Sequence, residues 1–507
     1  MKNLSQLASA VPGARVIGSD AAVSGVRFDS RQVQPGDLFV AMRGIPLPGR
    51  EPLDGHEFLP MAIEKGAAAV VIEADRVSPL ESLDIPKLAV ADARASLGAI
   101  SSAYFDEPSK SLFVAGVTGT NGKTTTTQMI DAIARTAGDI TGVIGTIGVT
   151  INGASEETPG DRTTPEAPDL QELLARVVAA GGKSAAMEVA SNALTSGRVS
   201  GIAYDVAVFT NLTQDHLDVH GTMENYRDAK GMLFREWADA ARAAGKHFTA
   251  VINVDDAYGP YYANATHAER LLTYSPGGKN RADIVAEDLE LAVDSLSFTA
   301  RTPIGDIPIR LPFGGTFQAA NALGAVGYGV ARGLSPETIA SGLANCPPVP
   351  GRFEPVKAGQ DFAILVDYAH TPDGIENVLK AARPLTSGRL ICVFGCGGDR
   401  DNTKRPKMGR LAELFSDIAI VTSDNPRTED PERIIDMVLR GMEGDQPCEV
   451  RKETDRRKAI ALAISLGQPG DTIVIAGKGH EDYQILGTQK IHFSDVEVAT
   501  EEVKARA

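Results

Sequence analysis

Short apolar runs alternate with amphipathic segments along most of the chain. Between about residues 109 and 345 the strand-like runs are LFVAGVTG, SAAMEVA, YDVAVFTNL and HFTAVINV, separated by stretches of helical periodicity. Strands that alternate with helices in this way are typical of a parallel sheet covered by helices. The pattern therefore predicts a central α/β domain, the largest in the chain.

A second series of strands follows a proline-rich segment. NCPPVPGRFEPV, residues 345–356, has four prolines in a dozen residues and predicts a linker. The runs after it are apolar on both faces: FAILVDYA, RLICVFGC, DIAIVTSDNP and DTIVIAGKG. Such strands are buried between two layers of helices. We expect a doubly wound, Rossmann-like domain.

The start of the chain predicts a smaller α/β unit. Short strands in VSGVRFDSRQVQPGDLFVAM precede a helix around EFLPMAIEKGA and a strand, AAAVVIEA. The polar segment DEPSKS then comes before a fresh strand and predicts a boundary. We therefore expect an α/β protein of three domains, covering residues 1–108, 109–346 and 347–507.

Composition narrows the function classes. The 507 residues include 66 acidic and 50 basic side chains, a net charge of -16, which argues against a nucleic-acid partner. Four cysteines without a CxxC pair favour reduced thiols over a disulfide scaffold. The first residues lack the pattern of a signal peptide and no apolar run is long enough for membrane insertion. We expect a cytoplasmic protein.

The stretch GVTGTNGKTTTT, which begins at Gly116, raises the question of a phosphate loop. The usual pattern requires a glycine at position 117, where this chain has Val117. A strand, a glycine turn, Lys123 and a threonine-rich helix start nevertheless follow in order. Inward-pointing amides, a helix N-terminus and a lysine suit a triphosphate, and Thr124 stands where a hydroxyl reaches Mg²⁺. We expect nucleotide binding.

Several residues downstream could hold a metal. Glu188 ends an apolar strand, where a carboxylate beside a phosphate loop can bind a cation, although a solvated strand end would look the same. His216 and His220 lie four residues apart, a spacing that suits a metal pair or local capping equally. Lys230 lies in a helical run, where a surface lysine is the ordinary interpretation.

An ordered series of motifs resembles the Mur ligases of peptidoglycan synthesis. The motifs span nearly the whole chain: GTNGKTTT, MEVAS, TNLTQDHLDVHGTMENYRDAK, GTFQAANALGA, PGRFEPV, DYAHTPDG, GCGGDRDNTKRPKMG, TSDNPR and AGKGHE. Within the family the chain is most similar to the members that add the third residue of the stem peptide. The resemblance implies a UDP-binding first domain, an ATPase central domain and an amino-acid-binding third domain.

The resemblance also implies a reaction. An ATP- and Mg²⁺-dependent ligase would phosphorylate the D-glutamyl γ-carboxylate of UDP-N-acetylmuramoyl-L-alanyl-D-glutamate, and an amine of meso-2,6-diaminopimelate would attack the acyl phosphate. Positioning and charge neutralisation would supply most of the catalysis. Two Mg²⁺ sites and a CO₂-derived carbamate on Lys230 are implied, because a carbamate is an anionic oxygen ligand whereas an ammonium repels the cation. We expect a monomer.

The family motifs assign roles to residues around the nucleotide. The ATP-binding positions are Gly119, Thr120, Asn121, Gly122, Lys123, Thr124 and Thr125, with Asn321, Arg352 and Asp367 near the adenosine. The metal ligands are Thr124 and Glu188 for one Mg²⁺, and His216 and carbamylated Lys230 for the other. Lys123, Glu188, His216 and Lys230 form the implied catalytic set.

The motifs also assign the two other substrates. The UDP-muramoyl-dipeptide positions are Phe28, Ser30, Gly44, Ile45, Pro46, Thr163, Thr164 and Arg198. The diaminopimelate positions are Arg400, Asp424, Asn425, Pro426, Arg427, Gly477 and Glu481. An arginine fork suits the distal carboxylate that diaminopimelate has and lysine lacks. GCGGDR has an arginine in place of the third glycine of a dinucleotide fingerprint, so NAD binding is not expected.

The sequence departs from the family pattern at one loop. Ala190, Ser191 and Asn192 replace the usual pair of serines and a histidine, and Ser196 replaces a frequent glutamine. These changes bear on how the dipeptide is held. Three alternatives stay open: a lysine- or ornithine-adding member of the family, a folylpolyglutamate synthase-like ligase, and a phosphate-loop switch that hydrolyses ATP only to change shape.

Overall fold

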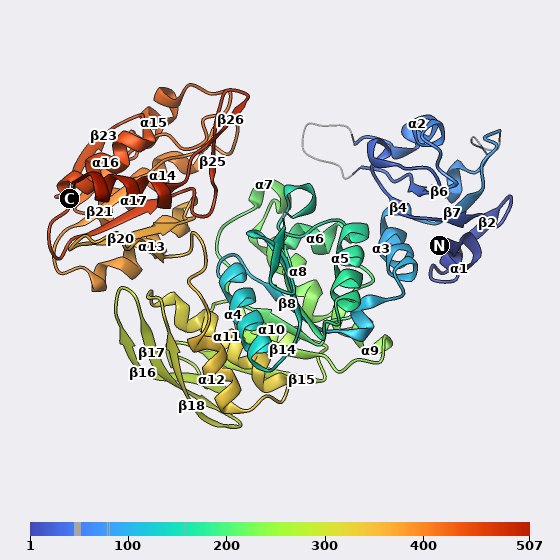
Figure 1. Ribbon diagram of the computed structural model, residues 1–507, viewed down its shortest axis with the longest axis horizontal. Helices are drawn as coiled ribbons and strands as arrows, with labels where there is room; N and C mark the ends of the chain where they lie inside the picture. Colours follow the sequence, from blue (N-terminus) through green and yellow to red (C-terminus); the bar gives the residue numbers. More distant parts are fainter. Residues whose placement is uncertain (45–51, 79, 81, 157, 507) are drawn as a thin grey trace.

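The computed structural model describes residues 1–44, 52–78, 80, 82–156 and 158–506 and contains three main sheets, each accompanied by helices (Figure 1). This is the α/β architecture predicted from the alternating pattern. Within these ranges, no helix combines the length and apolar character needed to span a bilayer.

The first sheet has five strands in the order β2-β7-β6-β5-β4, parallel except for β2. Its strands are β2 (Arg15–Ile17), β4 (Val26–Arg27), β5 (Leu38–Val40), β6 (Ala69–Glu73) and β7 (Lys87–Val90). The helices of this unit are α1 (Leu4–Ala8), α2 (Leu59–Glu64) and α3 (Ala93–Tyr104). Buried leucines and valines of the strands pack against α1 and α3.

The central sheet has eleven strands in the order β11-β10-β9-β12-β8-β13-β14-β15-β16-β17-β18. The parallel part comprises β9 (Thr141–Gly145), β12 (Ser184–Glu188), β8 (Phe113–Thr118), β13 (Val206–Phe209), β14 (Thr249–Asn253), β15 (Arg270–Ser275) and β16 (Ile284–Leu291). Antiparallel strands extend both ends: β10 (Gly148–Ile151), β11 (Ala154–Glu156), β17 (Leu296–Thr302) and β18 (Gly305–Leu311).

The antiparallel ends differ from the purely parallel sheet that the sequence predicted. Burial alternates along β17 and β18, as expected when one face of a strand packs on the core and the other faces solvent. The parallel strands β8, β12, β13 and β14 are buried at nearly every position. Apolar runs therefore reveal the covered middle of the sheet, whereas the half-exposed ends carry a different pattern.

Helices cover both faces of the central sheet. On one face lie α4 (Lys123–Thr136), α11 (Phe317–Ala331) and α12 (Pro336–Ala344). On the other lie α5 (Ala167–Ala179), α6 (Ser191–Thr195), α8 (Met223–Gly231), α9 (Glu236–Ala243) and α10 (Gly259–Ala265), with the short α7 (Leu217–His220) leading into α8. Each face buries its own apolar cluster.

The third sheet has six strands in the order β19-β20-β24-β21-β22-β23, parallel except for β19. Its strands are β19 (Glu354–Pro355), β20 (Ala363–Asp367), β21 (Leu390–Phe394), β22 (Ile418–Val421), β23 (Glu449–Lys452) and β24 (Thr472–Ala476). One face packs on α13 (Pro372–Ala382), α14 (Lys404–Phe415) and α15 (Pro431–Leu439), the other on α16 (Arg456–Leu466) and α17 (Asp495–Arg506). This is the predicted doubly wound arrangement.

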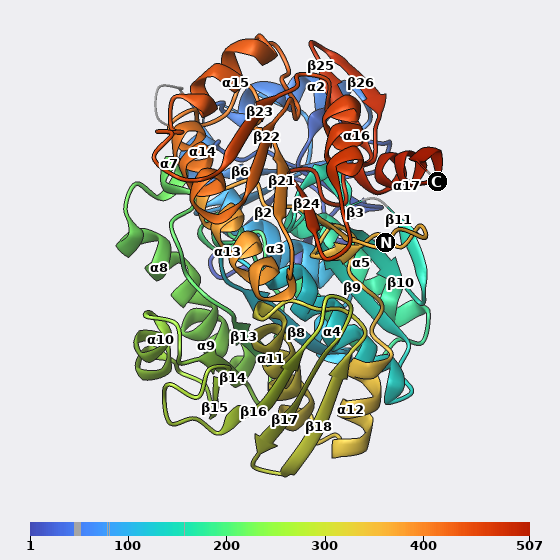
Figure 2. The same cartoon turned by 90° about the vertical axis from the view of Figure 1, so that its left-hand side faces the viewer.

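The third domain lies against the start of α4. In both views α13 is on the side of the third domain that faces the central domain (Figure 1; Figure 2). Ligands of open α/β sheets bind outside the carboxyl ends of the strands. The loops after β8 and β20 meet at this place, which directs attention to the phosphate-loop candidate.

Candidate active site

The turn between β8 and α4 can exist only with glycines at two positions. Gly119 has φ 152°, and a Cβ there would lie 1.9 Å from Thr210 Oγ1. Gly122 has φ 84°, and a Cβ there would lie 2.2 Å from Asn321 Oδ1. Side chains at these two positions would clash with Thr210 and Asn321, so only glycines allow the backbone to form this tight turn, here called the phosphate cradle. Val117 is buried within β8, so the chain turns only after the strand ends.

The cradle presents hydrogen-bond donors at the start of a long helix. α4 begins at Lys123 and has 14 residues, so its first amides and dipole favour an anion. The Lys123 ammonium donates to Gly119 O at 3.0 Å and to Thr120 O at 2.8 Å. Burial lowers the pKa of Lys123. The residues present fit the phosphates of a nucleotide.

Oxygen ligands lie beside this cradle. Glu188 is 1% exposed at the end of β12, and its carboxylate accepts hydrogen bonds from Thr146 N at 2.8 Å and Thr146 Oγ1 at 3.1 Å. Thr124, also buried, begins α4 next to Lys123. A carboxylate and a hydroxyl are donors that Mg²⁺ accepts. Among the residues described, no three His, Cys, Asp or Glu side chains cluster as a ready-made metal site.

Lys230 approaches the cradle from α8. It is 1% exposed, its Nζ donates to Gly119 O at 2.8 Å, and it lies 4.6 Å from the ring centroid of Tyr226. Burial, together with the charge of Lys123, lowers the pKa of Lys230 well below its usual value. The helical run thus holds a buried lysine, not the surface lysine that is the ordinary interpretation.

The histidine pair gathers around the same tyrosine. His220 stacks on Tyr226 with ring centroids 5.2 Å apart, and its Nε2 is 2.9 Å from Ser191 Oγ. His216 has φ 52° and lies edge-on to Tyr226 at 6.0 Å. The His220 ring is inclined by 27° to the Tyr226 ring and the His216 ring by 74°. A joint metal site for the two histidines stays a hypothesis.

The predicted dipeptide-binding residues lie beside Glu188. Thr163 Oγ1 is 3.0 Å from Thr146 Oγ1, and Thr164 Oγ1 donates to Glu188 O at 2.9 Å. Arg198 Nη1 donates to Thr164 O at 3.4 Å. The structure thus places these residues next to the phosphate cradle.

Residues of the third domain also reach the cradle. Arg352 Nη2 donates to Thr124 Oγ1 at 3.3 Å, and its guanidinium lies 4.6 Å from the ring centroid of Tyr368. Asn321, which belongs to α11 of the central domain, lies against the same loop at Gly122. Asp367, at the end of β20, accepts from Phe353 N at 2.7 Å, and burial raises its pKa.

Comparison with known proteins places this geometry in a family. Three Mur ligase descriptions match: the family's catalytic domain over residues 22–105, the Mur ligase middle domain over 117–329, and the glutamate ligase domain over 351–479. The chain belongs to the Mur ligase family. The resemblance that the motifs predicted is confirmed.

Two full-length relatives and one solved structure that resemble this Mur ligase share a name. A Geobacillus kaustophilus protein, 45% identical over 96% of both chains, and a Synechococcus elongatus protein, 48% identical over 95% of this chain and 94% of its own, are named UDP-N-acetylmuramoyl-L-alanyl-D-glutamate--2,6-diaminopimelate ligase. A solved structure with that name is 32% identical, covers 97% of both chains and has a TM-score of 0.67.

A folylpolyglutamate synthase from Mycobacterium tuberculosis, solved with ADP, shares the fold of this Mur ligase over part of its length. It is 21% identical, with a TM-score of 0.60, and covers 74% of this chain. At that identity the likeness concerns the fold alone. The full-length relatives favour a Mur ligase with a first domain of its own.

The residues predicted for the UDP end lie in that first domain. Ser30 is buried with its Oγ 3.4 Å from Met61 Sδ, and Gly44 N donates to Leu53 O at 2.7 Å. Phe28 follows β4 and packs against the core of this domain. Ile45 and Pro46 lie outside the described residues. The first sheet stands apart from the phosphate cradle (Figure 1).

The predicted amino-acid residues converge at the carboxyl edge of the third sheet. Asp424 and Asn425 are buried after β22, and Asn425 Nδ2 donates to Glu481 Oε2 at 2.9 Å. Arg427 has φ 53°, and its Nη1 donates to Gly398 O at 2.8 Å. Three further predicted residues lie on these loops: Arg400, Pro426 and Gly477.

Two residues that contact the predicted site, Asp373 and Lys478, were not predicted from the sequence. Asp373 Oδ2, at the start of α13, accepts from Asn121 Nδ2 at 2.7 Å and from Thr213 Oγ1 at 2.9 Å, which ties the third domain to the phosphate loop. Lys478 is fully buried next to Asn425 and Glu481, two of the residues predicted to bind the amino acid. Both residues belong to family motifs, DYAHTPDG and AGKGHE. The sequence alone did not indicate the distant residues that they contact.

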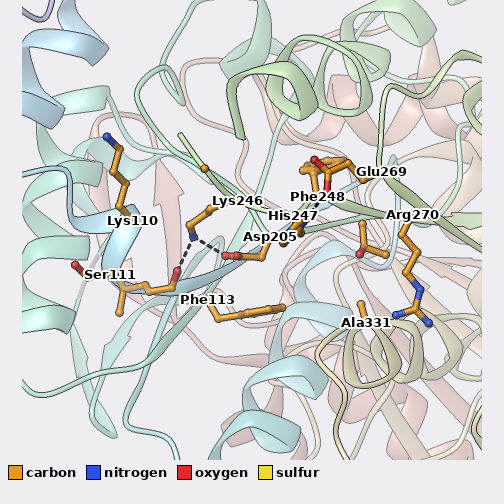
Figure 3. A pocket seen from close by; sticks show the side chains of 13 residues that line it. Lys110, Ser111, Phe113, Asp205, Lys246, His247, Phe248, Glu269, Arg270 and Ala331 are labelled. Atoms are coloured by element: carbon orange, nitrogen blue, oxygen red, sulfur yellow. Dashed lines mark hydrogen bonds and ion pairs between the residues drawn. The ribbon is translucent and has the colours of Figure 1, made fainter. Parts of the chain in front are cut away.

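A pocket of about 670 Å³ lies at the opposite edge of the central sheet (Figure 3). Its floor is the ion pair between Lys246 Nζ and Asp205 Oδ2, at 2.5 Å, and Lys246 also donates to Leu112 O. His247 Nδ1 is 2.5 Å from Glu269 Oε2. The Lys246–Asp205 ion pair and the His247–Glu269 contact lie at the amino ends of the strands, away from the cradle, so this pocket is not the active-site candidate.

Proposed function

We propose that this Mur ligase adds meso-2,6-diaminopimelate to the D-glutamyl γ-carboxylate of UDP-N-acetylmuramoyl-L-alanyl-D-glutamate at the expense of ATP. The observation that carries the proposal is the meeting of two domains at one loop. Arg352 and Asp373 of the third domain contact Thr124 and Asn121 of the phosphate cradle. The domain that would hold the amine therefore touches the loop that would hold the nucleotide.

The reaction requires that a carboxylate become an electrophile. A γ-carboxylate oxygen attacks the terminal phosphorus of ATP, the bond to the bridging oxygen breaks and ADP leaves. The uncharged amine then attacks the carbonyl carbon of the acyl phosphate, the carbon–oxygen bond breaks to release inorganic phosphate, and the proton lost by the nitrogen leaves with the phosphate. Both steps gain from fixed positive charge and orientation.

The residues of the cradle supply that charge. Lys123 and the first amides of α4 neutralise the phosphates, and Lys123 exchanges its contacts with Gly119 O and Thr120 O for phosphate oxygens. Thr124 and Glu188 would hold one Mg²⁺, which screens the charge of the transferring group. Asn321, Arg352 and Asp367 would flank the adenosine.

Lys230 would serve a second Mg²⁺ only after modification. As an ammonium it donates to Gly119 O and offers no lone pair to a cation. A carbamate formed with CO₂ has two oxygen acceptors, and His216 would complete the site. Burial at 1% exposure shields such a group from water. The CO₂-derived carbamate is therefore part of the proposal.

The remaining substrates take the positions that the family motifs assign. Thr163, Thr164 and Arg198 lie beside Glu188, where the dipeptide carboxylate would meet the nucleotide. Phe28, Ser30 and Gly44 would hold the UDP end. Arg427 would bind the distal carboxylate of diaminopimelate. The phosphorylated substrates belong to the cytoplasm, where we propose that the enzyme acts as a monomer.

The test offers UDP-muramoyl-dipeptide and ATP with diaminopimelate, lysine or ornithine in parallel, and measures phosphate release and product mass. The proposal predicts a tripeptide product with diaminopimelate and little turnover with the others. A preference for lysine or ornithine would overturn the amino-acid assignment. Turnover of ATP that ignores every amine would overturn the ligase assignment.

A further inference from the structure

Lys478 lies among the residues predicted to bind the amino acid, and its side chain is fully buried. A buried ammonium is costly unless charged or polar partners surround it. Its Nζ is 3.1 Å from Glu481 Oε2, 3.3 Å from Asn425 Oδ1 and 3.6 Å from Asp424 Oδ1. The lysine thus joins the loop after β22 to the loop after β24.

The partners of Lys478 are held in place by further contacts of their own. Asn425 Oδ1 also accepts from Ile485 N at 2.9 Å, and Gln484 Nε2 donates to Asp424 O at 2.7 Å. The ring centroid of Tyr483 lies 5.3 Å from the ammonium. The pocket wall formed by β25 (Tyr483–Leu486) therefore depends on the same few atoms.

The backbone beneath Lys478 is fixed independently of its side chain. Arg456 and Asp495 form an ion pair with both side chains fully buried, with Nε at 2.8 Å from Oδ1 and Nη2 at 2.6 Å from Oδ2. The same Nη2 donates to Ala476 O at 3.0 Å, at the end of β24. Removing the Lys478 ammonium would leave this end of β24 in place and would take from Glu481 and Asp424 a cation that lies within 3.6 Å of both.

We propose that Lys478 is a positioning residue that sets the affinity of the pocket for its diamine substrate. Its ammonium holds Glu481 and Asp424 close together, where two carboxylates alone would repel each other. Glu481 keeps a second oxygen for an ammonium of the incoming amino acid. This inference rests on the proposed function, because it concerns the pocket that function assigns.

A role in folding alone is the competing explanation, and kinetics separate the two. If Lys478 orients the pocket, its loss raises KM for diaminopimelate and leaves KM for ATP and for UDP-muramoyl-dipeptide unchanged. If Lys478 only stabilises the domain, its loss lowers the melting temperature and leaves all three constants unchanged in the folded protein.

The experiment compares Lys478→Met and Lys478→Gln with Lys452→Met. Lys452 also pairs with two carboxylates, Glu432 at 2.7 Å and Asp436 at 2.9 Å, but on the surface of the same domain. We expect at least about a tenfold rise in KM for diaminopimelate in both Lys478 variants, because truncating one partner of a buried charge pair is strongly unfavourable. Lys452→Met should match the wild type.

Rescue sharpens the test. In Lys478→Ala, added propylammonium can occupy the vacated space and should lower the raised KM for diaminopimelate, with no effect on the wild type. Folded Lys478 variants with a wild-type KM for diaminopimelate would overturn the inference. A wild-type enzyme that joins no amine at all would instead overturn the proposed function, so the two failures are distinguishable.

Discussion

Two regions of this Mur ligase each bury a lysine, and the two lysines differ in the charged groups that surround them. At the phosphate cradle, Lys230 donates to a backbone carbonyl, lies over an aromatic ring and faces the like charge of Lys123. In the third domain, beside the residues predicted to bind the amino acid, Lys478 lies within 3.6 Å of two carboxylates. At Lys230, burial and the charge of Lys123 outweigh the favourable charge of Asp215 and lower the pKa of the lysine. At Lys478, two carboxylates lie close to the ammonium.

This difference in surroundings suggests a different chemical role for each lysine. A buried lysine that is poorly compensated favours its uncharged form, which is the form that reacts with CO₂. A buried lysine that contacts two carboxylates links the segments that carry them and so organises its neighbours. Changes near the cradle should therefore act on kcat, and changes in the pocket should act on KM for the amine.

The largest effect should come from the cradle. Lys123→Met removes the cation that would neutralise the transferring phosphate, and we expect kcat to fall by about 1000-fold or more. Phosphate release under saturating substrates measures it. Lys110→Met, a surface lysine paired with Glu107, is the control. A loss of less than about tenfold would contradict the role of Lys123.

Lys230 should show the second largest effect. We expect Lys230→Met to lower kcat by about 100-fold, because the variant could not form the carbamate that is proposed as an anionic metal ligand. In buffer stripped of CO₂ the wild type should lose activity and regain it with bicarbonate, whereas the variant should respond to neither. Wild-type activity that does not change when CO₂ is removed would contradict the proposed carbamate.

Arg427 tests the pocket side of the comparison. Arg427→Ala should raise KM for diaminopimelate by about 30-fold and leave kcat within about threefold, because a charge-assisted contact to one carboxylate is lost. Arg433→Ala, an exposed arginine of α15, is the control. Lysine as substrate should be indifferent to Arg427→Ala, and an equal rise for both amines would contradict the assigned contact.

Ala190 should show the smallest effect. Ala190 N donates to Thr164 Oγ1 at 3.1 Å, beside the predicted dipeptide residues, and the usual family hydroxyl is missing there. We expect Ala190→Ser to lower KM for UDP-muramoyl-dipeptide about threefold, the gain of one modest hydrogen bond. An unchanged KM would show that the departure from the family pattern has no bearing on this substrate.

The sequence predicted local features better than meetings between distant segments. Gly119, Gly122 and Lys123 are neighbours in one turn, so the sequence motif alone predicts that they act together. Fully apolar strands likewise predicted the two sheets that helices cover on both faces. The contact between Asp373 and Asn121 spans 252 positions, and no local pattern indicates it. No local pattern singles out Lys478 either, because its contacts depend on Asp424 and Asn425, which lie on the loop after a different strand, β22.

The most direct measurement follows oxygen through the reaction. UDP-muramoyl-dipeptide with heavy oxygen in its γ-carboxylate is turned over with ATP and diaminopimelate, and the released phosphate is analysed by mass spectrometry. The account predicts that one heavy oxygen passes from the carboxylate to each phosphate, because the acyl phosphate breaks at its carbon–oxygen bond. Phosphate free of heavy oxygen, with tripeptide formed, would contradict it.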